Sequence, residues 1–590
     1  MRACLQPLRR LTIMLGCLLV SLTTLVQAQQ IPSFLWAKSG GGTGYEAGHQ
    51  IELDAAGNIY TAGVFSGISS FGTSTLTSRG DNDVYLAKYD SQGRFLWVRQ
   101  LGGISYETVG GLSVDATGNV YITGSFFTPF INVRNQASTI IIGTTTLIGG
   151  MFGEMYLAKY DSQGNALWAR QTFSTGATGN TGISTGHSLA VDNGGNVYVA
   201  GRTANMTQFD NIGVNSTNGS SIFMAKYNAQ GIVQWVKNNP GLTTGELIKN
   251  IAINSRGEIY LSGKYVVSVT LGNTTLPTPA VNDADLYLAK FDAQGNPIWV
   301  KLFVGVGAEN CNGLMLDPAD NIVLAVSFHK TISHANQTFT VQGPSTTSNS
   351  DVLVLKYNPA GDLLWSKQLG GASTSGPNSH GDSDTITGLD TDSQGNIYVA
   401  AVLIGMPTLT TSDGTDTFHY HFICYSPTGA VRWTRPTATS SYSSAIAVTP
   451  CGEILSTGYI EYSRPFDQIK LTSLGSLDYY IAKLGASTLI SSTANCSPIF
   501  TDGGPSGPNK LITPNIITPN GDNQNETFRL PGLPAGPWQL DVYNRWGTRV
   551  YHTDDYRQDW DGSGLPAGQY YYYLQAPNMS AIKGWLEIIH

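Results

Sequence analysis

Two short stretches decide the fold. They are VDATGNVYITG (114–124) and EMYLAKYDSQGNALWAR (154–170), and near copies of both recur along the chain. In each stretch an Asp-started, Gly-containing turn separates two runs rich in Val, Tyr, Leu and Ala. Asp and Asn favour the start of such turns because the side chain bonds its own backbone, and Gly takes the left-handed position. Each stretch therefore predicts a β-hairpin, giving four strands per repeat.

A Trp marks the fourth strand of each repeat, and a Lys or Arg follows it two positions later. Seven of the 11 Trp occupy this position: Trp36, Trp97, Trp168, Trp235, Trp299, Trp365 and Trp433. The D-x-x-G-N turn also recurs, from 53–63 to 448–458. A four-stranded unit repeated seven times predicts an all-β fold, a seven-bladed β-propeller.

The two ends of the array predict closure. The array begins with a lone fourth strand, Phe34 to Lys38, and finishes with a lone third strand, Tyr480 to Leu484. Pairing of these strands would complete the last blade and remove two sheet edges. The alternative is an open solenoid, in which both ends stay unpaired.

Composition excludes several classes of protein. The 590 residues contain 33 Lys+Arg and 41 Asp+Glu, a formal net charge of −8, with 10% aromatics and 68 Gly. The negative charge argues against a nucleic-acid binder that relies on a basic face. The aromatic content opposes a disordered chain, and the Gly count is too low for collagen.

The first 28 residues read as a secretory signal peptide. Three Arg precede the apolar run 11–26, and Ala28 ends an A-x-A-like cleavage site. A retained membrane anchor is the alternative. No other segment is long and apolar enough to span a membrane, so we expect a mature chain without a span, with a propeller at 29–485.

The repeat pattern resembles a known family. VDxxGNVYVTG followed by DxYLAKYDxxGxxLWxK is similar to the bacterial β-propeller repeat family, SBBP, over roughly residues 30 to 485. The resemblance implies the fold and implies no activity.

The composition of the chain changes after residue 485. Residues 486–511 are rich in Ser, Gly and Pro and predict a linker. Residues 512–590 hold about seven short strand-like runs, which predict a small Ig-like β-sandwich. Three motifs stand out there: Pro519, Asn520, Gly521 and Asp522; then Asn544, Arg545, Trp546 and Gly547; then Trp560, Asp561 and Gly562.

These motifs resemble the gliding motility-associated C-terminal domain, the type B sorting domain of the type IX secretion system of Bacteroidota. The resemblance implies the type IX secretion machinery as a partner. It also implies export to the outer membrane exterior of a Gram-negative bacterium, as a secreted or cell-surface protein.

Candidate binding positions follow from the blade pattern. The long loops between second and third strands share one face and differ in every blade, so this face is the candidate site. Near the start of the first strand five blades carry an acid: Glu46, Glu107, Glu246, Glu309 and Asp384. These acids are expected to ring the channel mouth, where they would bind Ca²⁺ or, alternatively, cap loop backbone.

A second acid set is predicted to form salt bridges within each blade. Counting through the hairpin places Asp83 diagonal to Arg99, Glu154 to Arg170, Asp285 to Lys301, and Asp478 to Lys38.

No catalytic motif or cofactor site is evident, and the pair His419 and His421 lacks a third metal ligand. In an exported protein, Cys451 with Cys496 is the best disulfide candidate, because both are expected at the short-turn face. The four Cys of the mature chain allow three connectivities, and the alternative is that two of them stay free.

The sequence therefore favours a non-enzymatic surface or secreted protein that uses its loop face for binding or adhesion, with a glycan or surface ligand as partner. The alternatives are a secreted polysaccharide-active hydrolase or lyase, and a purely structural surface component. An enzyme should place at least two acid/base residues of singular identity close together at the channel mouth.

Overall fold

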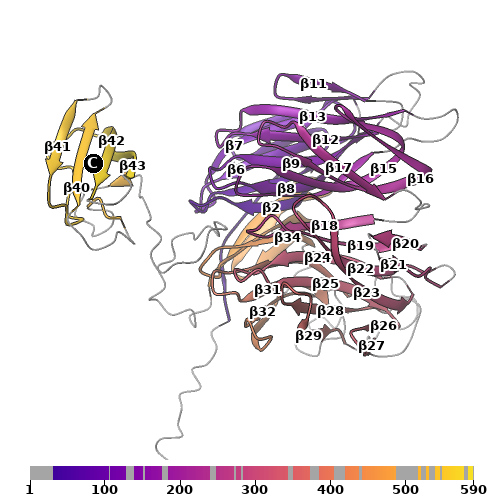
Figure 1. Cartoon of the computed structure of the whole chain (residues 1–590). Coiled ribbons are helices and arrows are strands. Elements are labelled where there is room, and N and C mark those ends of the chain that lie inside the picture. The colour runs from indigo at the N-terminus through magenta and orange to yellow at the C-terminus, as the bar shows by residue number, and fades with distance from the viewer. Residues whose placement is uncertain are drawn as a thin grey trace, which may run out of the picture. The chain divides into compact units, whose positions relative to one another are not determined.

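The computed structural model describes residues 31–486 and 516–588. Gaps lie at 105, 128–137, 150–152, 176–183, 240–246, 267, 272–273, 281–282, 308, 343–349, 372–383, 404–418 and 438–441 in the first range, and at 518, 520–526, 531–537, 545–547 and 577–581 in the second. The chain divides into two compact units, Met1–Gly503 and Gly504–His590. The described residues form strands and no helix, so none of them forms a helix able to cross a membrane (Figure 1).

The described strands of the first unit include seven antiparallel groups of four. The first three groups are β2 (Glu46–Leu53), β3 (Ile59–Phe65), β6 (Asp83–Tyr89), β7 (Phe95–Gly102); β8 (Tyr106–Val114), β9 (Val120–Phe127), β12 (Glu154–Tyr160), β13 (Ala166–Thr175); and β14 (Thr185–Val191), β15 (Val197–Phe209), β16 (Ile212–Tyr227), β17 (Val233–Asn239). The next three are β18 (Leu247–Ile253), β19 (Ile259–Tyr265), β22 (Asp285–Phe291), β23 (Pro297–Val306); β24 (Asn310–Leu316), β25 (Ile322–His329), β28 (Ser350–Tyr357), β29 (Leu363–Leu369); and β30 (Thr385–Thr391), β31 (Ile397–Leu403), β32 (His419–Tyr425), β33 (Val431–Pro436).

The seventh group joins the two ends of the array. It consists of β34 (Tyr442–Val448), β35 (Ile454–Ile460), β38 (Asp478–Leu484) and the N-terminal β1 (Phe34–Gly42). β1 runs antiparallel to β38, with Phe34 opposite Leu484 and Lys38 opposite Ile481. The first strands of the groups contact one another in the order β2, β8, β14, β18, β24, β30, β34, and β34 contacts β2.

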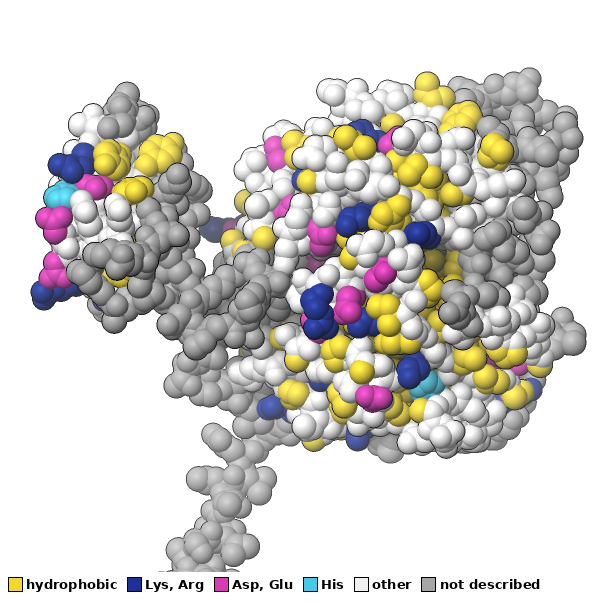
Figure 2. All heavy atoms as spheres, in the orientation of Figure 1, with side chains coloured by type: hydrophobic (Ala, Val, Ile, Leu, Met, Phe, Trp, Pro, Cys, Tyr) yellow, Lys and Arg dark blue, Asp and Glu magenta, His cyan; other side chains and the backbone are white. Residues whose placement is uncertain are grey.

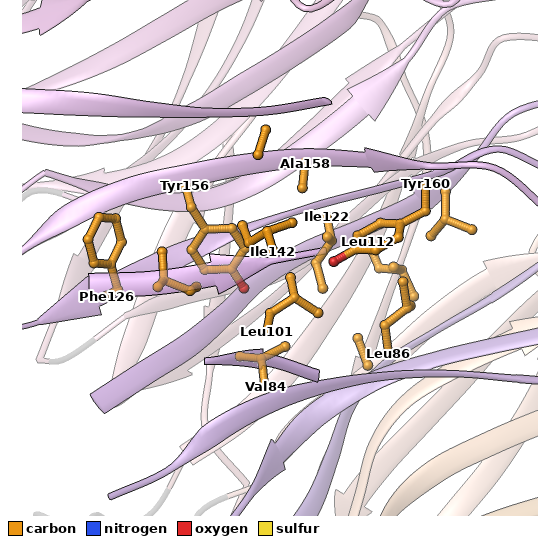
Figure 3. Close-up of a cluster of buried hydrophobic side chains, with 14 of the residues drawn as sticks. Val84, Leu86, Leu101, Leu112, Ile122, Phe126, Ile142, Tyr156, Ala158 and Tyr160 are labelled. Carbon is orange, nitrogen blue, oxygen red and sulfur yellow. The ribbon is translucent and has the colours of Figure 1, made fainter. Parts of the chain in front are cut away.

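The core lies between neighbouring sheets. Strands such as β6 and β12 are buried along their whole length, as the two-sided apolar pattern of YLAKY predicts. In Figure 3, side chains of one sheet (Leu86, Leu101) meet those of the next (Ile122, Tyr156). Full burial of one such side chain stabilises the fold by about 1.5–3 kcal/mol.

Short hairpins occupy most of the described segments that the sequence suggested were long variable loops. They are β4 (Ile68–Phe71) and β5 (Ser74–Thr77), β10 (Thr139–Ile142) and β11 (Thr145–Ile148), β20 (Val269–Leu271) and β21 (Thr274–Leu276), β26 (Thr331–His334) and β27 (Gln337–Thr340), and β36 (Ser463–Phe466) and β37 (Ile469–Thr472). β4, β10 and β26 each pair with the outer strand of the preceding group, namely β1, β7 and β23. Part of each loop is therefore structural, because it extends the neighbouring sheet.

The second unit contains one described sheet, with the order β39 (Ile516–Ile517), β43 (Ile582–Ile588), β42 (Gly568–Gln575), β40 (Gln539–Asn544), β41 (Arg549–Thr553). The second sheet of the expected sandwich is not among the described residues. Trp560 is 6% exposed and its ring centroid lies 5.2 Å from that of Tyr551, so this motif residue belongs to the core.

Some of the other motif residues are described by the structure and others are not. Asp561 Oδ1 accepts the Ser563 amide at 2.9 Å, Asn544 Oδ1 accepts the Thr548 amide at 3.0 Å, and Gly562 has φ 72°. Pro519 is partly buried. Six predicted motif residues lie outside the described residues: Asn520, Gly521, Asp522, Arg545, Trp546 and Gly547.

Candidate functional site

The repeated Lys of the third strand ties three of the groups to the next one, through Lys88, Lys290 and Lys356. Lys88 Nζ lies 3.5 Å from Asp54 Oδ2 of the same group and donates to the Ser162 carbonyl of the following group at 3.2 Å. The same ammonium lies 4.7 Å from the centroid of the Tyr60 ring. An ion pair, a hydrogen bond and a cation–π contact thus converge on one buried cation.

The repeated Trp and the cation after it make the same kind of tie. Trp97 Nε1 donates to the Ser162 carbonyl at 3.2 Å, and Arg99 Nε donates to the Gly164 carbonyl at 2.7 Å. Trp168 and Arg170 repeat the contacts one group later, with the Ala229 and Gly231 carbonyls. These contacts hold neighbouring groups together, although Nε1 of Trp36 and of Trp299 is buried without a hydrogen-bond partner among the described residues.

The predicted salt bridges within each blade are wrong. Asp83 instead accepts a hydrogen bond from Gln100, while Arg99 reaches the next group. The reason is a β-bulge at the start of the fourth strand: Tyr89 pairs with Phe95, but Lys88 pairs with Trp97. One extra residue moves Arg99 to the opposite face of the sheet.

The bulge also separates the other predicted pairs. Glu154 accepts hydrogen bonds from Thr172 and Ser174, and Asp285 accepts the Gly305 amide. Asp478 accepts the Leu474 amide, and Lys38 donates to the Gly93 carbonyl.

Replacing Lys356 with Met should destabilise the first unit by about 3–5 kcal/mol, because it leaves a buried carboxylate unpaired. Lys356 Nζ lies 2.7 Å from Asp317 Oδ2, and the two side chains are 2% and 4% exposed. Arg94→Ala is the matched control: Arg94 is 79% exposed in its pair with Asp90, so its loss should cost less than about 1 kcal/mol. Urea unfolding checks both, and equal destabilisation would contradict a structural role for the repeated Lys.

The described acids expected at the channel mouth are buried at the junctions between groups. Glu46, Glu107 and Glu309 are at most 1% exposed, and Asp384 is 2% exposed. The Glu46 amide donates to the Leu477 carbonyl and the Glu107 amide to the Asn82 carbonyl, just before the third strand of the preceding group. Glu46 also caps loop backbone, since its Oε2 accepts the Gly42 amide at 3.1 Å; for the other acids the capping alternative stays a prediction. Glu246 lies outside the described residues.

Two of these carboxyls are poorly satisfied. The side-chain oxygens of Glu107 and Glu309 make no hydrogen bond with a described group. Burial, and then the nearby Asp83, raises the pKa of Glu107 to about 9. Burial, and then Asp283 and Asp285, raises the pKa of Glu309 to about 9. Both carboxyls are therefore protonated near neutral pH.

Stability should consequently fall as the pH rises. Above about pH 4.3 the unfolded chain releases these protons while the folded chain retains them until about pH 9, so the destabilisation grows across that window. The urea midpoint of Glu107→Gln should exceed that of the parent chain by more at about pH 8.5 than at about pH 5. Glu309→Gln should behave alike, and a difference from the parent that does not change with pH would contradict the account.

The cysteines agree in part with expectation. Cys451 is in a disulfide bond, and Cys311 and Cys424 are buried free thiols. The predicted partner, Cys496, lies outside the described residues, so that pairing stays a prediction. Among the described residues no group of three or more His, Cys, Asp or Glu is arranged to hold a metal. The Ca²⁺ suggestion for the acids also stays a prediction.

A second bulge supplies a site that the sequence reasoning missed. It lies in the first strand of every group, where Gly48 pairs with Gly63 but Gln50 pairs with Ala62, leaving His49 unpaired. The equivalent bulge residues are Gly110, His187, Lys249, Asn312, Thr387 and Ser444. Bulges re-aim side chains and are common beside functional sites. Because these strands contact one another in a cycle, the seven positions follow the same cycle.

Six of the seven bulge residues have polar side chains, the exception being Gly110, and they follow no repeat pattern. Lys249 is exposed and the other six are partly buried. A Cβ on Gly110 would lie 2.0 Å from the Gly186 carbonyl oxygen, so Gly is needed for the close approach of β14. The sequence does contain a signal for these positions: the residue five places before the one that starts the first turn differs between repeats, whereas the turn itself stays similar.

Two imidazoles in this set are neutral near pH 7. Burial lowers the pKa of His49. Burial, then Lys249 and Arg202, lowers the pKa of His187 to about 4. His187 Nε2 lies 2.8 Å from Thr185 Oγ1. Neutral imidazoles can exchange hydrogen bonds or protons with a ligand.

On the face shown in Figure 2, Lys and Arg lie singly among acidic and uncharged side chains.

The cyclic contacts of four-stranded sheets, with side-chain ties between several neighbouring sheets, define a β-propeller repeat protein. Residues 96–125, 167–206 and 364–402 match the SBBP beta-propeller repeat family, and residues 511–588 match the CHU_C type IX secretion signal domain. The chain therefore carries SBBP repeats followed by a type IX secretion signal domain, as the sequence motifs indicated.

Curated relatives are only partly similar. An uncharacterized WD repeat-containing protein of Acanthamoeba polyphaga mimivirus is 24% identical over 65% of this chain and 32% of its own length. The regulatory protein FlaEY of Caulobacter vibrioides is 34% identical over 27% of this chain and 17% of its own. The chain thus spans less than a third of these relatives.

Solved structures give a distant likeness. Virginiamycin B lyase of Staphylococcus aureus is 8% identical over 76% of this chain and 98% of that chain, with a TM-score of 0.35. A polysaccharide lyase described as an ulvan lyase is 11% identical over 76% of this chain and 97% of that chain, also with a TM-score of 0.35.

Proposed function

We propose that this chain is an exported, non-enzymatic binding protein that acts at the cell surface or after secretion. Its seven four-stranded groups form one closed seven-bladed ring, followed by an Ig-like sandwich that the type IX secretion machinery recognises. The ring binds a glycan or another surface ligand, in adhesion, at the outer membrane exterior. The match of residues 511–588 to a secretion signal domain supports the export route.

One observation carries the binding role. Several of the recurring Lys and Trp are engaged in ties to the next group, whereas the inner bulges carry residues that follow no repeat pattern. Residues free of the structural ties are the ones available to a ligand.

The second candidate is a secreted polysaccharide-active hydrolase or lyase. His49, His187 and Lys249 favour it, because they are acid/base residues of singular identity at the same position of the inner strands.

A single set of samples distinguishes the two candidates. The full chain is incubated with a panel of immobilised and soluble polysaccharides, and bound protein and released oligosaccharides are measured together. Saturable binding without released product is expected. Release of product that His187→Asn abolishes would replace the binding function with the enzymatic one.

A further inference from the structure

The third and fourth groups each carry a cation at one position of the second strand where the other groups carry none. Arg202 and Lys264 each follow the last small residue of the second strand, and the matching residues elsewhere are Val64, Ser125, Ser327, Val402 and Tyr459. His187 and Lys249 occupy the inner bulges of the same two groups. These four side chains are therefore additions to the repeat and serve none of its ties.

The four side chains lie on neighbouring strands. β14 and β18 contact each other, and the Ile251 amide of β18 donates to Ser188 Oγ of β14 at 3.3 Å. Arg202 pairs with Thr185, whose hydroxyl lies 2.8 Å from His187 Nε2. Lys264 occupies the matching place in β19, opposite Leu247. The pKa of His187 is lowered by burial and then by Lys249 and Arg202, which places all three in one electrostatic neighbourhood.

This cluster lacks a negative partner among the described residues. Arg202, Lys249 and Lys264 make no ion pair there, although the whole chain has a formal net charge of −8. Arg202 Nε is buried without a hydrogen-bond partner in the described structure. Lys264 Nζ has only an amide oxygen, Asn310 Oδ1, at 3.5 Å. Like charges held close together repel one another, and an anionic ligand would offset that repulsion.

We propose that Arg202, Lys249 and Lys264, with His187 beside them, form a subsite for the anionic group of a glycan, either a uronate carboxylate or a sulfate ester. The proposal rests on the proposed binding function and names its ligand class. The planar guanidinium fork of Arg202 suits two oxygens of such a group, and the two ammonium groups supply charge. Neutral His187 can donate one further hydrogen bond without adding to the repulsion among the cations.

The test uses the full chain and three probes: alginate for carboxylate, dextran sulfate for sulfate, and unmodified dextran as the neutral chain. Affinity is measured by titration calorimetry in two salt concentrations. The parent chain should bind one of the two anionic probes and not dextran. Arg202→Gln with Lys249→Gln should weaken that binding by about tenfold or more.

Arg94→Gln with Lys470→Gln is the matched control, because it removes the same charge from exposed positions of the same unit. It should change the affinity by less than about twofold. Arg202→Lys with Lys249→Arg keeps the charge and should restore most of the binding, which separates loss of the site from loss of the fold.

Three results would overturn the proposal. Equal weakening in the control pair would show that binding depends on the net charge of the chain and not on this cluster. Binding of a neutral glycan without either anionic probe would remove the anionic subsite and leave the proposed binding function standing. Binding of none of the panel polysaccharides would remove both. His187 gives an independent readout by NMR: its pKa should rise when the anionic probe binds, and an unchanged value would also count against the subsite.

Discussion

Deletion of residues 504–590 should abolish export while leaving the propeller folded. The two units are separate compact bodies, and residues 511–588 match a secretion signal domain, so the signal can be removed without removing the core of the first unit. The truncated chain is expected to accumulate within the cell envelope. Protease treatment of intact cells and immunoblotting of the medium measure the change.

Fusion supplies the control for this deletion. Residues 504–590 joined to an unrelated carrier that also bears a signal peptide should bring the carrier to the surface or the medium. Trp560→Ala in the fusion should abolish that export, because Trp560 lies in the core of the second unit. Undiminished surface exposure of the truncated chain would contradict the assigned export route.

Deletion of residues 29–40 should destabilise the first unit more than any single substitution. β38 would lose its partner and present a free edge, and the contacts of β1 with other groups would vanish. Among these contacts, the Phe34 ring centroid lies 6.3 Å from that of Phe422 in the sixth group, and Lys38 Nζ donates to the Gly93 carbonyl at 2.6 Å. We expect a loss above about 5 kcal/mol, measured by urea unfolding or as failure to yield folded protein.

Substitutions of two neighbouring side chains of β1 test whether the stability depends on the packing of this strand. Trp36→Ala should destabilise by about 3–5 kcal/mol, since its ring packs over Gly93 of the next group. Leu35→Ala should cost less than about 1 kcal/mol, because Leu35 is 54% exposed. A synthetic peptide of residues 31–42 added to the deletion variant should restore stability. An unchanged melting temperature after deletion would refute closure by β1.

The strand groups were predictable because the turns that form them are local. Asp54, Gly57 and Asn58 in the first turn, and their copies, specify hairpins whatever the surrounding structure does. The pairing of β1 with β38 followed from the two incomplete ends of the array. The short hairpins within the long loops were missed, although a Gly with positive φ between two short runs, at Gly72 and at Gly143, marks the turn of each.

The bulges were not predictable, and the site residues depend on them. One extra residue near Leu96 reverses the faces of Arg99 and Gln100, although the turn length stays the same. The same kind of irregularity makes His49 and His187 singular positions of the inner strands. Glu107 and Glu309 were expected to face the channel mouth. They are buried instead, and the side chain of Glu309 packs against Gly305, which has no side chain of its own.

The most direct test of the binding function compares inner-bulge variants with hairpin variants of the full chain against one polysaccharide that the parent binds. His187→Asn with Lys249→Gln alters the inner bulges, and Thr73→Asn with Ser74→Asn alters an exposed hairpin turn as the control. The account predicts that binding weakens by about tenfold or more only in the inner-bulge variant, with equal melting temperatures and no released oligosaccharide. Full binding by that variant, or cleavage by the parent chain, would contradict it.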